Sequence, residues 1–370
     1  MPARLLAAPP GDGLRELYRA EQLPVLQNRM FASAEAAREC ARGDVVLVQS
    51  SATGLIFNAA FRPELVEYDA DYQNEQGLSA AFARHLDAVI EVMNRHFAGA
   101  TLIEVGCGKG LFLERLLASG FDVTGLDPTY EGSNPRVIKK FFTPETGLLA
   151  DGIVLRHVLE HVVDPVAFLA GLLESNGGEG KIYIEVPCLD WIVRNDAWFD
   201  IFYEHVNYFR LSDFDRMFGT LLEAGHTFGG QYLYAVADLA TWRVPRARAR
   251  DAFQFPPGFM SSFDACEARL AAQPPRVPRV IWGGASKGVI FALFMERAGT
   301  PIDTVIDINP AKQGRYLAGT GLRVQSPDKA MAHLPDGADV FVMNSNYLRE
   351  IEAATAHRYH CLLIDQGNDT

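Results

Sequence analysis

The chain has 370 residues, of which 48% are hydrophobic and 22% are charged, so it can form packed cores and does not belong to the disordered class. Its 46 acidic and 34 basic residues give a net charge of −12, which argues against binding to nucleic acid or anionic membranes. No run approaches the roughly 20 apolar residues that span a bilayer. The N-terminus matches a signal peptide poorly, and the five scattered cysteines do not predict disulfides. We therefore expect a soluble, cytoplasmic α/β protein of two or three domains.

Residues 1–75 mix short apolar runs with turn formers and are expected to form a small N-terminal module. Residues 80–96 place their apolar side chains on one stripe, which predicts an amphipathic helix. A strand at 101–105, a glycine-rich turn, a helix and a strand at 121–126 follow. This order predicts a parallel pair with a right-handed crossover, extended by strands at 152–155 and 181–186 and a helix at 164–173.

A proline-rich stretch at 243–278, with some helix around 262–271, is expected to connect two domains. The strand–glycine–helix–strand order then repeats, with strands at 280–282 and 304–308 on either side of a turn at 283–288. Strands near 340–343 and 361–364 would complete a second, smaller α/β sheet. The predicted domains are therefore 1–75, 76–243 and 244–370.

The first glycine turn has the features of a nucleoside site. Gly106, Gly108 and Gly110 would let the backbone turn tightly and let a ligand approach it. Asp127 follows the second strand, where a carboxylate can accept bonds from both ribose hydroxyls. The spacing G-x-G-x-G differs from that of dinucleotide sites, and Glu104 suits a cationic ligand without pyrophosphate. These residues favour S-adenosylmethionine over a dinucleotide; a turn needed only for packing is the remaining alternative.

Several motifs resemble a known family. The segments EVGCGKG, GLDP, VLRHVLEHVVDP and IYIEVP resemble class I S-adenosylmethionine-dependent methyltransferases. The segment IFYEHVNYF and the distal block beginning WGGASKG resemble the three-part C-methyltransferases that act on nucleotide-linked deoxysugars and other natural-product intermediates. The resemblance covers about residues 23–364. It implies a central Rossmann-like methyltransferase domain, a Rossmann-like C-terminal domain, S-adenosylmethionine as donor and S-adenosylhomocysteine as product.

The N-terminal module departs from this family. Its relatives usually carry paired C-x-x-C zinc motifs, whereas Ser50 and Thr53 stand at that spacing here, and Cys40 is the nearest cysteine. Hydroxyls do not replace the four thiolate or imidazole ligands of a structural zinc. We therefore expect the module to keep its fold through apolar packing and the protein to contain no zinc.

Two histidines fit the pattern H-x-x-E-H, which some zinc proteases use. On a helix, His157 and His161 could share a metal, but their segment follows a strand at the position where a methyltransferase sheet faces its cofactor. We therefore expect no metal there. His157 is expected to form hydrogen bonds, either to the ligand or within the structure, and His161 to face the substrate.

Glu204 and His205 stand between aromatic residues and are the candidate base. Carbon methylation requires a base, because the acceptor must lose a proton before its carbon attacks the methyl group. A histidine suits that task, and a carboxylate can orient it or act itself. The resemblance marks this pair as catalytic candidates and Tyr72, with Tyr68 as the alternative, as a tyrosine offered to the substrate. The alternatives are a buried pair that braces an aromatic cluster and a tyrosine that only packs.

The sequence thus predicts base-assisted C-methylation of a small natural-product or sugar-like acceptor. Methylation of nitrogen, oxygen or sulfur, which depends more on alignment than on a base, is the enzymatic alternative. A third possibility is that the protein binds the cofactor without catalysing a reaction. The second glycine turn is not a P-loop, because Lys287 precedes its last glycine. Asp307 resembles a ribose-binding acid, and Lys287 would either hold a substrate phosphate or carboxylate or face solvent.

Overall fold

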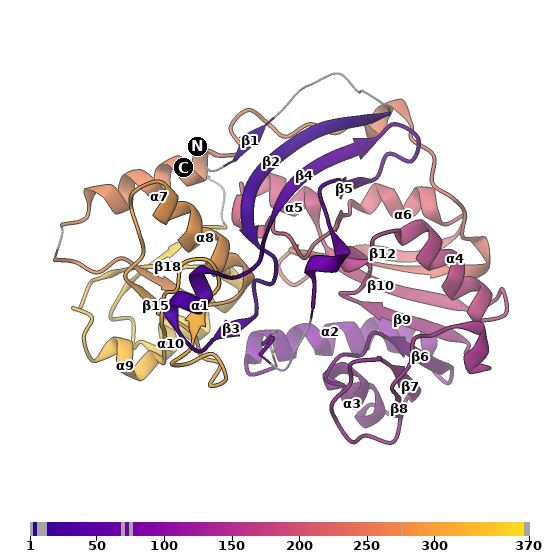
Figure 1. Ribbon diagram of the computed structural model, residues 1–370. Helices are drawn as coiled ribbons and strands as arrows, with labels where there is room; N and C mark the ends of the chain where they lie inside the picture. The colour runs from indigo at the N-terminus through magenta and orange to yellow at the C-terminus, as the bar shows by residue number, and fades with distance from the viewer. Residues whose placement is uncertain (1–2, 6–12, 68–70, 74–76, 275, 366–370) are drawn as a thin grey trace.

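The computed structural model describes residues 3–5, 13–67, 71–73, 77–274 and 276–365. It is an α/β protein whose long strands β2 and β4 arch between a central domain and a C-terminal domain (Figure 1). The expectation of two α/β sheets with parallel strands is confirmed. Among the described residues, no helix is long and apolar enough to cross a membrane.

The N-terminal module is built on an antiparallel sheet that borrows a strand from the central domain. Its order is β1-β2-β4-β5-β11. The borrowed strand pairs Asn207 with Phe57, directly after the Glu204–His205 segment. A second pairing, of β3 with β16, joins the module to the C-terminal domain. The elements are β1 (Arg4–Leu5), β2 (Leu14–Pro24), β3 (Met30–Phe31), α1 (Ala34–Arg38), β4 (Arg42–Ser50), β5 (Ile56–Asn58), β11 (Asn207–Tyr208) and β16 (Tyr316–Leu317).

The turn after β4 contains Ser50 and Thr53, the two residues compared with a zinc motif above, and it is held by hydrogen bonds. The Ser50 hydroxyl accepts from the backbone N–H groups of Ala52 and Thr53, both at 3.2 Å. The Thr53 hydroxyl accepts from the N–H of Leu55 at 3.3 Å. Arg216 of the central domain donates to the carbonyl of Thr53. These hydroxyls therefore act as turn-capping groups, which serine and threonine favour.

The central domain has a seven-stranded sheet in the order β12-β13-β10-β9-β6-β7-β8. The predicted strands β6, β7, β9 and β10 are parallel, and the unpredicted β12 and β13 extend the sheet in antiparallel fashion. The strands are β6 (Thr101–Val105), β7 (Asp122–Leu126), β8 (Val137–Ile138), β9 (Gly152–Arg156), β10 (Lys181–Pro187), β12 (Leu221–Thr227) and β13 (Tyr232–Asp238). The helices are α2 (Ala80–Phe97), α3 (Leu111–Ala118), α4 (Pro165–Ser175), α5 (Leu189–Arg194) and α6 (Leu211–Met217).

The C-terminal domain has the predicted parallel sheet, in the order β17-β15-β14-β18-β19. It packs on the central domain through helix α8, whose Phe294 ring stacks on Trp198 at 5.2 Å between centroids. The elements are α7 (Ser261–Ala272), β14 (Val280–Trp282), α8 (Ser286–Arg297), β15 (Thr304–Ile306), β17 (Val324–Gln325), α9 (Pro327–Met331), β18 (Asp339–Val342), α10 (Leu348–Ala354) and β19 (His360–Leu363).

Candidate functional site

The glycine turn after β6 presents its backbone to open space. Gly106 has a φ of +72°, and a Cβ there would lie 2.5 Å from Val158, so only glycine fits. Gly108 also has a positive φ, of +53°, but a Cβ at that position would meet no atom within 4 Å. Gly110 precedes α3 with a φ of +81°. The turn therefore leaves room at Gly108 for a ligand to approach the main chain.

Asp127 lies at the carboxyl end of β7 and fastens this turn. Its Oδ2 accepts from the N–H of Gly108 at 2.8 Å, and its Oδ1 accepts from the N–H of Thr129 at 2.8 Å. The side chain is 8% exposed and stands at the edge where open α/β sheets bind nucleosides. This placement fits the predicted ribose-binding role.

Glu104, within β6, is a buried carboxyl group without a full set of partners. Its Oε2 has no hydrogen-bond partner among the described residues. Burial raises the pKa of Glu104 to about 8; the nearby charge of Asp127 also raises it, while Arg156 lowers it. The group is therefore mostly protonated at pH 7, and an ammonium group placed against it would favour its ionised form.

We expect S-adenosylhomocysteine, whose amino group is a cation, to displace this proton when it binds near pH 7. The folded pKa of about 8 lies above the ordinary value, so the proton is bound below pH 8 and released when a positive ligand lowers the pKa. Calorimetry in buffers of different ionisation enthalpy would measure the release. Glu104→Gln should abolish it; an equal release by this variant would contradict the assignment.

Glu185, at the carboxyl end of β10, is the centre of a buried network that sequence reasoning missed. Its Oε1 lies 2.7 Å from Arg156 Nη2, 3.1 Å from His85 Nε2 and 3.0 Å from His157 Nε2. The Tyr183 hydroxyl donates to its Oε2 at 2.7 Å. Burial opposes the ionisation of Glu185, but Arg156 and the two histidines outweigh it and hold its pKa well below the usual range.

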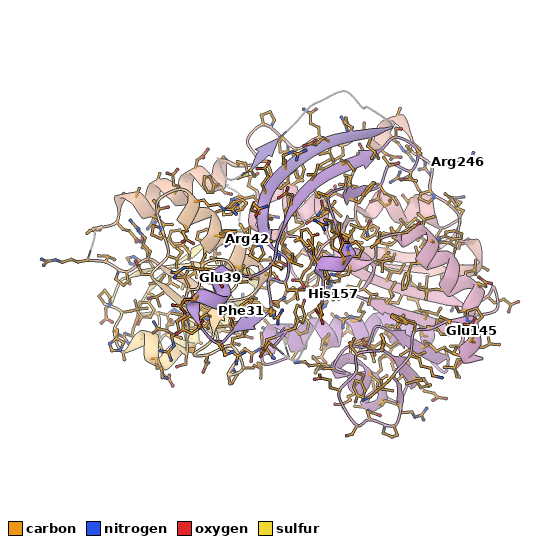
Figure 2. All side chains as sticks on the ribbon, in the orientation of Figure 1. Phe31, Glu39, Arg42, Glu145, His157 and Arg246 are labelled. Carbon is orange, nitrogen blue, oxygen red and sulfur yellow. The ribbon has the colours of Figure 1, made fainter. Side chains whose placement is uncertain are left out.

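His157, labelled in Figure 2, joins this network to a second group of residues. Its Nδ1 lies 3.3 Å from Glu160 Oε1, on the opposite side of the ring from Glu185. Burial opposes its charged form, but hydrogen bonds to the two carboxylates raise the pKa of His157 to about 9. Its φ of +52° and the 3₁₀ turn at Leu159–His161 exclude the helical metal pair considered for H-x-x-E-H. The structure gives His157 internal hydrogen bonds.

The second group brings together His161, Glu204 and His205. The Nδ1 of His161 lies 2.8 Å from the backbone oxygen of Glu204, and because a carbonyl oxygen only accepts, this nitrogen is the donor. The ring centroids of His161 and His205 are 5.1 Å apart, and those of Phe202 and His205 are 4.0 Å apart. Burial, helped by the charges of His161, His157 and Lys287, holds the pKa of His205 well below its ordinary value. Its imidazole is therefore neutral near pH 7, which leaves a lone pair for a proton, and the lowered pKa makes it a weaker base than an exposed histidine.

The Glu204 carboxylate is buried and tied to the N-terminal module. Its Oε2 accepts from the N–H of Gln27 at 2.9 Å, and the Tyr72 side chain is also hydrogen-bonded to it. Its Oε1 lacks a partner in the part of the chain described. Burial raises the pKa of Glu204, against the nearby charge of His161. The predicted Tyr72, His161, Glu204 and His205 are thus brought together, whereas Tyr68 lies outside the described residues.

The second glycine turn repeats the first in its backbone bonds but not in its open space. Asp307 accepts from the N–H groups of Gly284 at 2.9 Å and Asn309 at 2.8 Å, as Asp127 does in the first turn. A Cβ at Gly284, however, would meet Val305 at 3.2 Å, and Lys312 Nζ lies 3.5 Å from Asp307. The turn is therefore filled by protein.

The comparison with known families places these sites in named domains. Residues 74–221 match the family model described as a methyltransferase domain. The chain carries a methyltransferase domain. Residues 270–360 match the model described as a C-methyltransferase C-terminal domain. The methyltransferase domain contains both clusters around Glu185 and Glu204, and the C-terminal domain contains the second glycine turn.

Individual relatives are more distant. The chain is 24% identical over 273 residues to C-methyltransferase NovU of Streptomyces niveus, covering 64% of this chain and 65% of that protein. It is 32% identical over 123 residues to a ubiquinone biosynthesis O-methyltransferase of Cereibacter sphaeroides, and this match covers 28% of this chain and 45% of that protein. The matched part is thus below two thirds of either relative's length. Among solved structures, the plantazolicin methyltransferase BpumL aligns with a TM-score of 0.35 at 17% identity, over 44% of this chain and 86% of that one.

A cavity of about 510 Å³ shares no lining residue with the two clusters around Glu185 and Glu204. It is lined by Arg216, Arg243, Val244, Arg246 and Arg248 and contains none of the predicted site residues.

We expect the purified protein to contain no stoichiometric zinc, because Ser50 and Thr53 carry hydroxyls, which do not replace the thiolate ligands of a structural zinc. Elemental analysis of protein prepared without a metal-affinity step would measure it, and one zinc per chain would contradict the expectation. Within the described residues, one group of three could hold such an ion: Glu160, His161 and His205 place ligand atoms within 4.8 Å of one another. Loss of the metal in His161→Ala but not in Ser50→Ala would assign it there.

Proposed function

We propose that the chain is an S-adenosylmethionine-dependent methyltransferase that methylates a carbon atom of a small acceptor. The observation that carries this proposal is the convergence of buried Glu204 and His205 with half-buried His161 beside Tyr72. The match to a C-methyltransferase C-terminal domain and the similarity to C-methyltransferase NovU support the choice of carbon.

The residues around the first glycine turn fit the methyl donor. Asp127 offers a carboxylate to the ribose, Gly108 leaves space beside the backbone, and Glu104 offers a buried carboxyl group to the ammonium. S-adenosylmethionine, when bound, supplies an electrophilic methyl group on a sulfonium and leaves as S-adenosylhomocysteine. The match between this site and S-adenosylmethionine rests on these polar groups and on the open space beside Gly108.

The chemistry assigned to the chain's own residues is proton removal from the acceptor carbon. Neutral His205 accepts the proton, or the free Oε1 of Glu204 does so. His161 holds the Glu204 backbone, and Tyr72 holds its carboxylate. The buried surroundings exclude water from the carbanion or enolate that proton removal leaves.

Turnover with a panel of small carbonyl compounds, amines and alcohols tests this proposal. S-adenosylhomocysteine formed from S-adenosylmethionine would be measured for each compound. We expect formation with compounds that carry an acidic C–H bond. Formation with amines or alcohols alone would favour nitrogen or oxygen methylation, and absence of S-adenosylhomocysteine binding would contradict the donor assignment.

A further inference from the structure

The ammonium of Lys287 enters the methyltransferase domain from the C-terminal domain. It lies near the start of α8, and its Nζ is 3.2 Å from Asp200 Oδ2 and 4.8 Å from the centroid of the Trp191 ring. The Lys287 side chain is 11% exposed, so the alternative in which it faces solvent is wrong. Asp200 itself ends the 3₁₀ turn that precedes Glu204 and His205.

Two consecutive residues of the N-terminal module join Lys287's turn to the candidate base. The N–H of Gln27 donates to Glu204 Oε2, and the side-chain amide of Asn28 donates to the hydroxyl of Ser286 at 2.9 Å. Ser286 precedes Lys287, and Glu204 precedes His205. Neighbouring residues of the module therefore hold the backbone next to Lys287 and the candidate base close together. The charge of Lys287 also acts on His205.

The ammonium has unused hydrogen-bonding capacity. A lysine has three N–H donors, and the buried Lys287 Nζ has Asp200, at 3.2 Å, as its one acidic partner among the described residues, so at least two donors are left over. Asp200 neutralises its charge without filling its donors. The Asn28 Oδ1 and Glu204 Oε1 atoms are buried and unpartnered as well. Unsatisfied buried polar atoms on residues joined by these contacts point to a polar ligand.

We propose that Lys287 donates a hydrogen bond to the acceptor's carbonyl oxygen and stabilises the enolate formed when the proton is removed. The inference rests on the proposed function. In the step, the C–H bond next to the carbonyl breaks, its proton passes to His205 or Glu204, and its electron pair forms the C=C bond. The carbonyl π pair moves to oxygen, where the ammonium meets the new negative charge. Electrostatic stabilisation of this kind is effective in a site that excludes water.

The competing explanation is that Lys287 and Asp200 only dock two domains. Removing one partner of a buried ion pair leaves an uncompensated charge, so Lys287→Met alone would not separate the two explanations. The double variant Lys287→Met/Asp200→Asn keeps the shapes and removes both charges. If the pair only docks the domains, this variant should behave like the wild type. Lys181→Met, at the amino end of β10, is the control for loss of one lysine charge.

The probe is 4-nitrophenol, a flat acid whose ionised form absorbs visible light and resembles an enolate. It would be titrated by absorbance in excess protein saturated with S-adenosylhomocysteine. An ammonium within 4–6 Å lowers the pKa of an acid by about 1–3 units. We therefore expect the midpoint for the bound probe to lie about 1–3 pH units lower in the wild type and in Lys181→Met than in the double variant. Lys287→Arg should retain part of the effect.

Equal midpoints in the wild type and the double variant, or no lowered midpoint in the wild type, would overturn the proposal. Circular dichroism and thermal unfolding confirm that each variant is folded. Calorimetry with S-adenosylhomocysteine on the same samples tests the proposed function separately from the role of Lys287. Wild-type protein that fails to bind this ligand contradicts the proposed function, whereas normal binding with equal probe midpoints contradicts only the role of Lys287.

Discussion

Replacing His205 by alanine, or Glu204 by glutamine, is expected to slow methyl transfer by about 10²–10⁴-fold, the usual contribution of a general base. The affinity for S-adenosylhomocysteine should remain nearly unchanged, because the glycine turn and Asp127 belong to a separate set of contacts. Single-turnover rates and calorimetry would measure the two quantities. Glu204→Gln keeps the shape of the side chain and the oxygen that accepts from Gln27, so it separates charge from packing better than alanine does.

The pH dependence distinguishes the two candidate bases. Because the pKa of His205 is held well below 6.5, a reaction that uses its neutral form should persist at pH 6. A reaction that uses the Glu204 carboxylate should instead gain rate as pH rises through the raised pKa of that group. Wild-type rates in both variants would show that the pair is structural. Tyr208→Phe, beside His205 in the aromatic cluster, is a matched control that removes no candidate base.

Replacing Asp127 by alanine is expected to weaken S-adenosylhomocysteine binding by at least about 10²-fold. Charge-assisted hydrogen bonds contribute about 1.5–3 kcal/mol each, and two ribose bonds would be lost. The variant also loses the three bonds that Asp127 accepts from the N–H of Gly108 and from the N–H and hydroxyl of Thr129. Calorimetry would measure the affinity.

The matched control for this variant is Asp122→Asn, at the start of the same strand, whose carboxylate forms an exposed ion pair with Arg136. It should bind S-adenosylhomocysteine as the wild type does. Unchanged affinity in Asp127→Ala would contradict the assignment of the donor site.

Local patterns were enough to predict the parallel strands and the first glycine turn. The strand after residue 100 and the helix at 80–96 match β6 and α2 closely, because apolar periodicity and capping are local signals. The pairing of β11 with β5 was not predictable, since two-residue strands carry no periodicity and their partners are far apart in sequence. The antiparallel β12 was missed because its residues alternate only between half-buried and exposed.

Site residues could be predicted where they lie close together in the sequence, within one recognisable motif. Asp127 and Glu104 follow from their spacing to the glycines, and Glu204 and His205 are neighbours. Glu185 was missed because an acid inside an apolar strand gives no sign of the arginine and histidines that surround it. The pair of Lys287 and Asp200 joins two domains, so only the folded chain brings it together.

The position of the transferred methyl group tests carbon methylation most directly. The enzyme would be incubated with S-adenosylmethionine labelled with ¹³C in the methyl group and with an acceptor found in the turnover panel, and the product would be analysed by NMR. We expect a labelled methyl group bonded to carbon, formed by the wild type and strongly reduced in His205→Ala. A labelled methyl group bonded to oxygen, nitrogen or sulfur, formed at equal rates by both proteins, would contradict it.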